Sequence, residues 1–282
     1  MTNSRGIVLF AYNSDFDYVK IANVAAALSK KYIVDFPVTL ITDDFGALQA
    51  DRKFIDNIII CPSTGTNKRT VRTTHDASTQ VIDWKNLNRA SVFDLSPYDQ
   101  TLLIDCDYLM FNDNLCQLFF TNLEFTCFKE VYDVTGMNAF QNDTKLGQYS
   151  IPMLWATVIY FRKSAFSESI FDMMKLVQDN YHFYSKVYGF KENPFRNDFA
   201  LSIAYHALSG YGIDELIPYK LQSLASMTDV VDFRSNGDLI YQYKKDGRIN
   251  TGISAGTDLH IMNKSIFTDD IVNGMVQYAT KW

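Results

Sequence analysis

Two aspartates, Asp105 and Asp107, close an apolar run that begins at Leu102, and a single cysteine separates them. In an extended chain, residues i and i+2 point to the same face, so the two carboxylates lie on one side. Like charges this close repel each other, and something must offset the repulsion. A bound cation, a basic partner or solvent at the end of the strand could each do so.

Polar residues also follow two earlier apolar runs, at Tyr12-Asn13 and at Asp43-Asp44. Ligands of open α/β sheets bind beyond the carboxyl ends of the strands. There, a tyrosine can stack on a base, and an aspartate can accept hydrogen bonds from a uracil or a ribose. Two carboxylates can hold a hard divalent cation, which takes up the charge of a diphosphate. The pattern therefore predicts a site for a nucleoside diphosphate and a metal ion.

The elements that must position these residues alternate between strands and helices. Residues 5–13 predict a strand, residues 14–32 a helix with Ser14 and Asp17 as a capping box, and residues 36–44 a second strand parallel to the first. Further strands are expected at 57–62, 100–110, 125–130, 155–161 and 257–264, helices at 83–93, 164–181, 197–210 and 268–282, a loop at 63–80, and a hairpin around Asn236-Gly237.

Composition fits one soluble α/β domain. The chain has 282 residues, enough for a single large core, and no apolar run approaches the roughly 20 residues of a membrane span. The four cysteines form no C-x-x-C pair, which favours a reducing, cytoplasmic setting. The net charge of −6 disfavours a polyanionic partner, although residues 62–90 carry five basic residues against two acidic ones.

Residues 89–113, RASVFDLSPYDQTLLIDCDYLMFND, combine an arginine, the segment SPYD, an apolar strand and D-x-D. This block resembles the donor half of glycosyltransferases with the GT-A fold, and most closely those of family 8 (glycogenin- and galactosyltransferase-like). FAYNSDFDYVKIANVAAAL, ITDD, NDFALSIA and DLHIMNK resemble further segments of that family, in the same order. The chain departs from the family at Trp155-Ala156-Thr157, where the family usually has Asn-Ala-Gly, and after His260, where the late motif lacks its glycine.

The resemblance implies a Rossmann-like mixed sheet flanked by helices, in one domain over residues 1–282. Residues 1–128 would bind the nucleotide sugar, with a UDP-sugar as the expected donor, and residues 129–282 would form the acceptor half. The activity it implies is transfer of a sugar to a hydroxyl acceptor with retention of configuration. Asp105, Asp107 and His260 would bind Mn²⁺ or Mg²⁺, and the imidazole favours Mn²⁺.

The resemblance also implies roles around the donor. Asp198 would lie beside the donor sugar as the catalytic carboxylate, although an acid at a helix N-terminus also stabilises the helix dipole. The expected donor-binding residues are Ala11, Tyr12, Asp43, Arg89, Asn197 and Lys264, with Lys264 directed at the diphosphate and Asn197 also fitting a helix N-cap.

Three alternatives stay open at this point. The basic segment 62–90 could carry a phosphate backbone, as in a phage-type DNA glycosyltransferase that acts on hydroxymethylated bases. The acceptor would otherwise be a glycan or a small molecule. A sugar nucleotidyltransferase would open with a glycine-rich loop, which FAYNSDFD lacks. A non-catalytic module that binds sugar nucleotides would need no metal triad.

Overall fold

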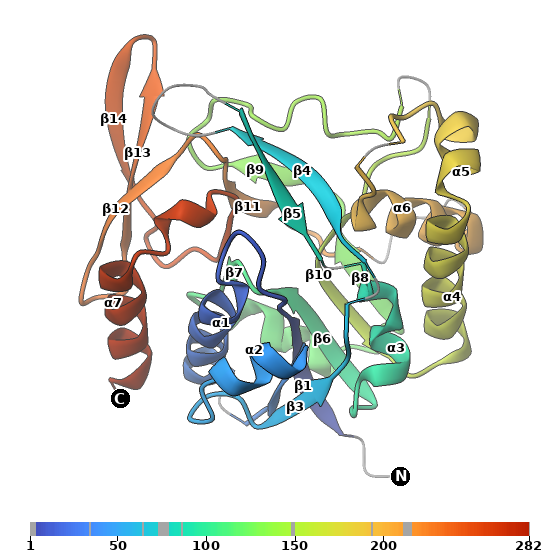
Figure 1. The fold of residues 1–282 in the computed structure, drawn as a ribbon, viewed down its shortest axis with the longest axis horizontal. Coiled ribbons are helices and arrows are strands. Elements are labelled where there is room, and N and C mark those ends of the chain that lie inside the picture. Colours follow the sequence, from blue (N-terminus) through green and yellow to red (C-terminus); the bar gives the residue numbers. More distant parts are fainter. Residues whose placement is uncertain are drawn as a thin grey trace.

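A six-stranded mixed sheet, with strand order β3-β2-β1-β6-β10-β8, forms the centre of the protein (Figure 1). The structure is a computed structural model that describes residues 4–281, except for residues 34, 64, 73–78, 86, 148–149, 193 and 211–215. For residues 69–72 and 79–80 it describes the backbone. His75 and Asp76, within the expected loop, therefore lie outside the described residues.

The four strands on one side of the sheet run parallel. They are β3 (Asn57–Ile60), β2 (Val38–Thr42), β1 (Arg5–Phe10) and β6 (Gln100–Asp105), and β10 (Trp155–Arg162) and β8 (Phe125–Phe128) complete the sheet in antiparallel pairings. The central strands are apolar runs because helices cover both faces. Ile7, Leu103 and Ile159 have no exposed surface. The carboxyl ends of the parallel strands bring the polar residues of the sequence motifs to one edge of the sheet.

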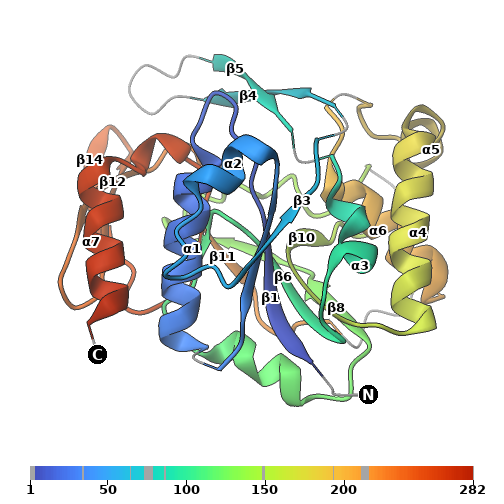
Figure 2. The ribbon, with the colours of Figure 1, turned by 60° about the horizontal axis from the view of Figure 1, so that its bottom comes forward.

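Helices cover the sheet on two sides, as Figure 2 shows. On one side lie α1 (Tyr18–Tyr32) and α7 (Asp269–Thr280), which pack against each other. On the other lie α3 (Val92–Leu95), α4 (Ala165–Asp179), α5 (Tyr181–Tyr188) and α6 (Asn197–Leu208). The short helix α2 (Asp44–Gln49) follows β2, and 3-10 turns occur at Arg89–Ser91, Asn114–Phe120 and Lys264–Ile266.

Of two predicted helix caps, the structure confirms one and contradicts the other. Thr268 caps α7, as expected, by accepting a hydrogen bond from the backbone N–H of Ile271. The capping box at Ser14 is wrong, because α1 begins at Tyr18 and its cap is Asp17, which accepts from the backbone N–H of Lys20. The acid three residues after Ser14 is thus the cap itself.

A second, four-stranded sheet brings the end of the chain back to the centre. It has the order β7-β15-β11-β9, formed by β7 (Tyr108–Leu109), β15 (Leu259–Ile261), β11 (Leu221–Leu224) and β9 (Val131–Asp133). In the antiparallel pair of β7 and β15, His260 lies opposite Tyr108. The late strand is therefore placed directly beside the D-x-D segment.

A three-stranded antiparallel sheet and a separate hairpin complete the fold. β12 (Asp229–Phe233), β13 (Leu239–Lys245) and β14 (Arg248–Ile253) form a three-stranded antiparallel sheet, and Gly237 in the turn has φ +95°, which confirms the predicted Asn-Gly hairpin. β4 (Asn67–Arg72) and β5 (Thr79–Trp84) form the other hairpin, which crosses above the carboxyl edge of the main sheet in Figure 2.

The sequence predictions for this second hairpin were wrong. Residues 63–80 were expected as a loop, and residues 83–93 as a helix. Instead, Asn67–Arg72 pairs with Thr79–Trp84, and the α-helical turn begins only at Val92. The segment has few apolar residues, so its pairing leaves no clear alternation of apolar and polar side chains.

Among the described residues, no helix has both the length and the apolar content needed to cross a bilayer. The mixed α/β fold class is confirmed.

Candidate active site

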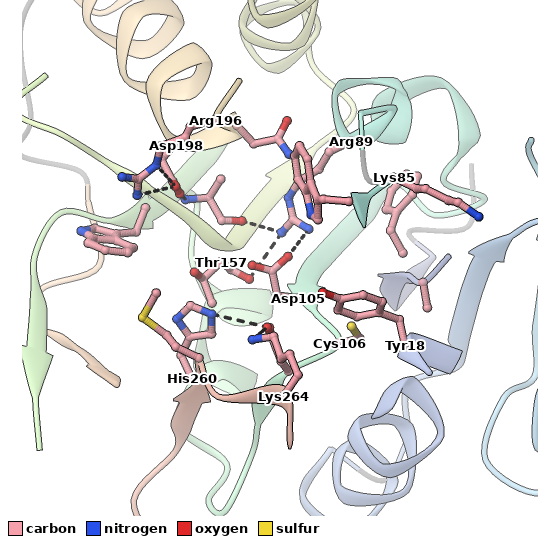
Figure 3. A pocket seen from close by; sticks show the side chains of 18 of the residues that line it. Tyr18, Lys85, Arg89, Asp105, Cys106, Thr157, Arg196, Asp198, His260 and Lys264 are labelled. Atoms are coloured by element: carbon pink, nitrogen blue, oxygen red, sulfur yellow. Dashed lines mark hydrogen bonds and ion pairs between the residues drawn. The ribbon is translucent and has the colours of Figure 1, made fainter. Parts of the chain in front are cut away.

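Asp105 and Asp107 line a cavity of about 460 Å³ at the carboxyl ends of β1 and β6 (Figure 3). Asp105 is the last residue of β6. Cys106 follows it, and Asp107 lies directly before β7. Asp107 is buried, with 7% of its surface exposed. Two acidic groups at the closed end of a cavity need compensating positive charge or a bound cation.

Two basic side chains supply that charge. Arg89, only 1% exposed, donates from Nη1 to Asp105 Oδ1 over 2.6 Å, and the Lys264 ammonium forms an ion pair with Asp107. Lys264 also donates to the backbone carbonyl of Ile261 at 2.5 Å. The repulsion between the two aspartates is thus offset by one basic partner for each.

These contacts divide the protonation behaviour of the two acids. Burial raises the pKa of Asp105, and the guanidinium of Arg89 offsets only part of that rise. For Asp107, burial acts in the same upward direction, but Lys264 and His260 together hold its pKa well below the usual range. Asp107 is therefore the carboxylate that stays ionised most firmly.

His260 joins the two aspartates through strand pairing. Because β15 pairs with β7, the backbone N–H of Ile261 donates to the carbonyl of Asp107 at 2.8 Å, and His260 Nε2 lies 3.5 Å from Asp107 Oδ1. One ligand atom from each of Asp105, Asp107 and His260 lies within 4.8 Å of the other two. Residues more than 150 positions apart are brought together by a two-residue strand.

This cluster suits a divalent cation. Two carboxylate oxygens and an imidazole nitrogen form a donor set that Mn²⁺ accepts readily. Asp107 Oδ1 and His260 Nδ1 are buried and, among the described residues, accept or donate no hydrogen bond of normal geometry, although Asp107 Oδ1 lies 3.5 Å from His260 Nε2. Unpartnered buried polar atoms are costly, so an additional ligand at Asp107 Oδ1 would satisfy one of them. The residues present therefore fit a bound Mn²⁺ or Mg²⁺.

Asp198 lies across the cavity from His260 and Lys264, as Figure 3 shows. Its Oδ1 accepts a hydrogen bond from the backbone N–H of Ala156 at 2.9 Å. Its Oδ2 accepts from Arg196 Nη2 at 3.1 Å. Both oxygens are thus held, which fixes an ionised carboxylate at the cavity wall.

The start of β10 makes this arrangement possible. The pairing of β10 with β8 shifts register between Trp155 and Ile159, which releases backbone groups from the ladder. The freed N–H of Ala156 binds Asp198, and its carbonyl accepts from Arg89 Nη2 at 2.5 Å. One irregular residue therefore connects the arginine behind Asp105 to the carboxylate on the opposite wall.

Ala11 and Tyr12, which follow β1, also line the cavity. Tyr12 is 3% exposed, and its hydroxyl donates to the carbonyl of Cys61 at 2.8 Å. Burial raises the pKa of Tyr12, so this hydroxyl stays protonated. Tyr18, which is partly exposed, and Trp84, which is 8% exposed, also line the cavity, and sequence reasoning did not single out either of them.

Three expected donor-binding residues lie differently from their predicted roles. Asp43 does not line the cavity; it caps α2 by accepting from the backbone N–H of Gly46 at 2.8 Å. Asn197 lines the cavity but is not the N-cap of α6, which is Arg196. Arg89 lines the cavity too, yet its guanidinium is bound to Asp105 and the β10 backbone.

Arg196 and Asp143 are site residues that the sequence did not reveal. Arg196 Nη1 lies 3.8 Å from Asp143 Oδ1, so the arginine spans from Asp198 to a segment that has no regular secondary structure. Arg196 also stacks 4.8 Å from the centre of the Phe199 ring. For Arg196, the only signal in the sequence was its position two residues before Asp198. For Asp143 there was no signal, because it lies in an irregular segment without periodicity.

The basic segment 62–90 is only partly described. Arg89 is buried, and Lys85 donates to the carbonyl of Asn13 at 2.8 Å, so both point into the protein. Lys68 is exposed on β4, whereas the side chains of Arg69 and Arg72 lie outside the description. The described part of the segment therefore presents little free positive charge.

Several solved structures of glycosyltransferases are similar to this chain. The apo form of GlyE from Streptococcus pneumoniae TIGR4 is 12% identical, with a TM-score of 0.42 over 73% of this chain and 44% of that one. The galactosyltransferase LgtC, in complex with donor and acceptor sugar analogs, is 14% identical, with a TM-score of 0.45 over 70% of this chain and 69% of that one. Mouse xyloside xylosyltransferase 1 is 10% identical, with a TM-score of 0.43 over 72% of this chain and 82% of that one.

The chain spans less than half the length of GlyE. No protein-family model and no curated protein matches the sequence. At these identities and TM-scores the likeness is too distant to carry function, so the function rests on the residues of the site.

Proposed function

We propose that this protein is a metal-dependent glycosyltransferase that moves a sugar from a nucleoside diphosphate sugar to a hydroxyl acceptor. The observation that carries the proposal is the cluster of Asp105, Asp107 and His260 at the wall of a cavity that Asp198 and Lys264 also line. The sequence resemblance to family 8 adds the finer expectations of a UDP-sugar donor and retention of configuration. In this proposal, Asp105, Asp107 and His260 hold Mn²⁺ or Mg²⁺.

The charges of the cavity match a diphosphate leaving group. When the bond between sugar and phosphate breaks, negative charge grows on the departing diphosphate. The bound cation supplies Lewis-acid stabilisation of that charge. Lys264, which is only 12% exposed, adds a fixed ammonium at the same end of the cavity. Burial strengthens its effect, because few water molecules screen it.

Asp198 acts at the other end of the donor. As the leaving group departs, the anomeric carbon gains positive charge, which a nearby carboxylate stabilises. Arg196 and the Ala156 N–H hold both oxygens of Asp198, so the carboxylate does not need to reorganise during the reaction. The opposite walls of the cavity thus carry opposite tasks, with cations near the diphosphate and an anion near the sugar.

The nucleoside fits beside Ala11 and Tyr12, where the partly exposed ring of Tyr18 can stack on a base. Asn197 and Arg89 remain candidates for contact with the donor sugar, although Arg89 would act chiefly by neutralising Asp105. This assignment keeps the donor within the described cavity.

Donor hydrolysis tests the proposal directly. The protein is incubated with a panel of UDP- and GDP-sugars in Mn²⁺ or in EDTA, and free nucleoside diphosphate is measured. We expect release from one donor in Mn²⁺, its loss in EDTA, and its loss in Asp107→Ala, with the exposed Asp179→Asn as a matched control. Binding of a nucleoside diphosphate without release from any donor, with or without added acceptors, would instead indicate a non-catalytic module.

A further inference from the structure

A second cavity, of about 680 Å³, adjoins the donor cavity. It is lined by residues 129–133, Asn138, Phe140, Gln141, Asp143, Thr144, Pro152, Trp155 and Lys220. Asp143 and Trp155 line both cavities, so the two spaces meet at these side chains. A molecule in the second cavity would thus contact the same two side chains as a molecule in the first.

The rim of this cavity is polar, aromatic and mostly uncharged. Gln141 and Thr144 are exposed and offer an amide and a hydroxyl, and Tyr132 on β9 is 46% exposed. Below them, the rings of Phe140 and Trp155 pack edge to face with centroids 5.7 Å apart. Amide and hydroxyl groups pair with hydroxyls, and an accessible ring can cover the C–H face of a sugar.

The charged groups of the second cavity largely cancel. Lys220 and Glu130 form an ion pair at 3.0 Å. Asp133 is buried, and its carboxylate accepts from Thr135 Oγ1 at 2.7 Å and from the backbone N–H of Ala139 at 3.1 Å. Lys129, which is partly exposed, is the other basic side chain of the lining. With one lysine paired to Glu130, the cavity does not favour a polyanion, whose binding needs several accessible basic groups.

Asp143 connects this cavity to the reacting end of the donor. It is half-buried, and its carboxylate lies 3.8 Å from Arg196, which in turn binds Asp198. Burial raises the pKa of Asp143, while Arg196 opposes that rise. A hydroxyl that donates to Asp143 would therefore be held at the boundary between the two cavities, next to the carboxylate assigned to the donor sugar.

We propose that the second cavity is the acceptor site, that it takes a neutral sugar unit, and that Asp143 accepts a hydrogen bond from the hydroxyl to be glycosylated. This inference rests on the proposed function. In the transfer, the bond between the anomeric carbon and the phosphate oxygen of the donor breaks, and the diphosphate leaves with the electron pair. A bond forms between that carbon and the acceptor oxygen, and the hydroxyl proton passes along its hydrogen bond to Asp143, which then releases it to water.

The test uses the full chain, the donor found by the hydrolysis assay and Mn²⁺. The acceptors are p-nitrophenyl α- and β-glycosides of glucose, galactose, mannose, xylose and N-acetylglucosamine, with a duplex containing 5-hydroxymethylcytosine as a separate arm. We expect mass spectrometry to show glycosylation of a glycoside. Tyr132→Ala should raise the KM for that acceptor by about 2- to 10-fold, the loss expected for one ring contact, and should change kcat far less.

Phe183→Ala is the matched control, since Phe183 is 61% exposed on α5 and lines neither cavity. Equal acceptor KM values for Tyr132→Ala and Phe183→Ala would overturn the inference. So would an enzyme that hydrolyses its donor yet glycosylates only the duplex, or none of the acceptors.

A binding measurement separates this inference from the proposed function. Saturation-transfer NMR with the corresponding methyl glycosides reports occupancy of the cavity without turnover. Glycoside signals that weaken in Tyr132→Ala, with no donor hydrolysis in the wild type, would keep the sugar site and reject the transferase. Donor hydrolysis with no glycoside signal would do the opposite.

Discussion

The two adjoining cavities differ in how their charged groups are held. In the donor cavity, Asp105 and Asp107 are each paired with a basic side chain, and Arg89 and Lys264 are 1% and 12% exposed. In the second cavity, the pair of Glu130 and Lys220 has side chains that are 52% and 55% exposed. The first is a rigid electrostatic site built at strand ends, and the second is an open polar surface.

In the proposed transferase, this difference would place the two requirements of the reaction in two different parts of the molecule. Stabilising a departing diphosphate needs charges fixed in a poorly solvated place, and the ends of buried strands supply them. Recognising an acceptor needs a shape and a set of hydrogen bonds, which irregular segments such as residues 138–144 can provide. The predictions below test whether the two regions differ as much in energy as they do in exposure.

The largest contrast should appear when one partner of each ion pair is removed. Asp105→Asn leaves the guanidinium of Arg89 buried without its counter-charge, so we expect the free energy of unfolding to fall by about 3–5 kcal/mol. Glu130→Gln in the exposed pair should cost less than about 1 kcal/mol. Urea denaturation of both variants measures the two values.

A double variant keeps this prediction falsifiable. Arg89→Met combined with Asp105→Asn removes both charges and should recover much of the stability lost in Asp105→Asn, without recovering activity. A loss in Asp105→Asn no greater than that in Glu130→Gln would show that the donor cavity is less isolated from water than its geometry indicates.

A smaller effect concerns the loop behind the metal ligands. Asp258 accepts hydrogen bonds from the backbone N–H groups of Phe111 and Asn112 at 2.6 and 3.1 Å and from the hydroxyl of Tyr108 at 3.1 Å. Burial nevertheless raises the pKa of Asp258 from 3.8 to about 6. Because this folded-state pKa lies above the unfolded value, protonation stabilises the fold. The contribution is complete below pH 3.8, is lost as the pH rises through 6, and amounts to at most about 3 kcal/mol.

The measurement compares wild type with Asp258→Asn by urea denaturation between pH 4 and pH 7. The stability of the wild type relative to the variant should increase as the pH falls. Asp179→Asn, at an exposed position, should show no such trend relative to wild type. A difference between wild type and Asp258→Asn that does not change with pH would contradict the assignment.

The sequence was sufficient to predict the parts of the site that lie on strong periodic elements. Asp105 and Asp107 were identified because they interrupt a buried strand, and the parallel pairing of β1 with β2 followed from the strand–helix–strand pattern. The placement of His260 beside Asp107 was expected only from family resemblance, because strand pairing across 150 residues leaves no local signal.

Other features depend on tertiary contacts that no local pattern records. Asp43 has the residue type and strand-end position of a ligand, but the polypeptide turns directly into α2 and uses it as a cap. The hairpin of β4 and β5 is stabilised by contacts such as that of Ser14 Oγ with the Asp83 carbonyl at 2.9 Å. Asp143 becomes a site residue only because Arg196 lies beside it.

Arg196→Leu, at the boundary between the two cavities, should lower kcat by an intermediate amount. The substitution leaves Asp198 held only by the Ala156 N–H among the two contacts that fix its oxygens, and it removes the link to Asp143. We expect kcat for transfer to fall by about 10- to 100-fold, because small misplacement of a catalytic group costs rate steeply. Arg196→Lys should recover little, since an ammonium lacks the planar fork of a guanidinium.

Steady-state kinetics and Mn²⁺ binding, measured together, check this prediction. Mn²⁺ affinity should stay within about twofold of wild type, because Arg196 lies on the wall opposite the metal ligands. Arg234→Leu, at an exposed position, is the control. A matching loss of Mn²⁺ affinity would mean that Arg196 acts through the fold rather than on Asp198.

The smallest expected effect sharpens the view of the donor cavity as a closed set of charges. Lys264 already neutralises Asp107, so a cation that binds there without nucleotide must approach an ammonium. Lys264→Met should therefore strengthen Mn²⁺ binding to the nucleotide-free protein about tenfold, a change of about 1.4 kcal/mol, while lowering kcat because the diphosphate loses a positive partner. Electron paramagnetic resonance of free Mn²⁺ measures the first effect and donor hydrolysis the second, with the exposed Lys145→Met as control. Mn²⁺ binding that weakens in Lys264→Met would show that the ammonium orders the metal ligands instead of competing with the ion.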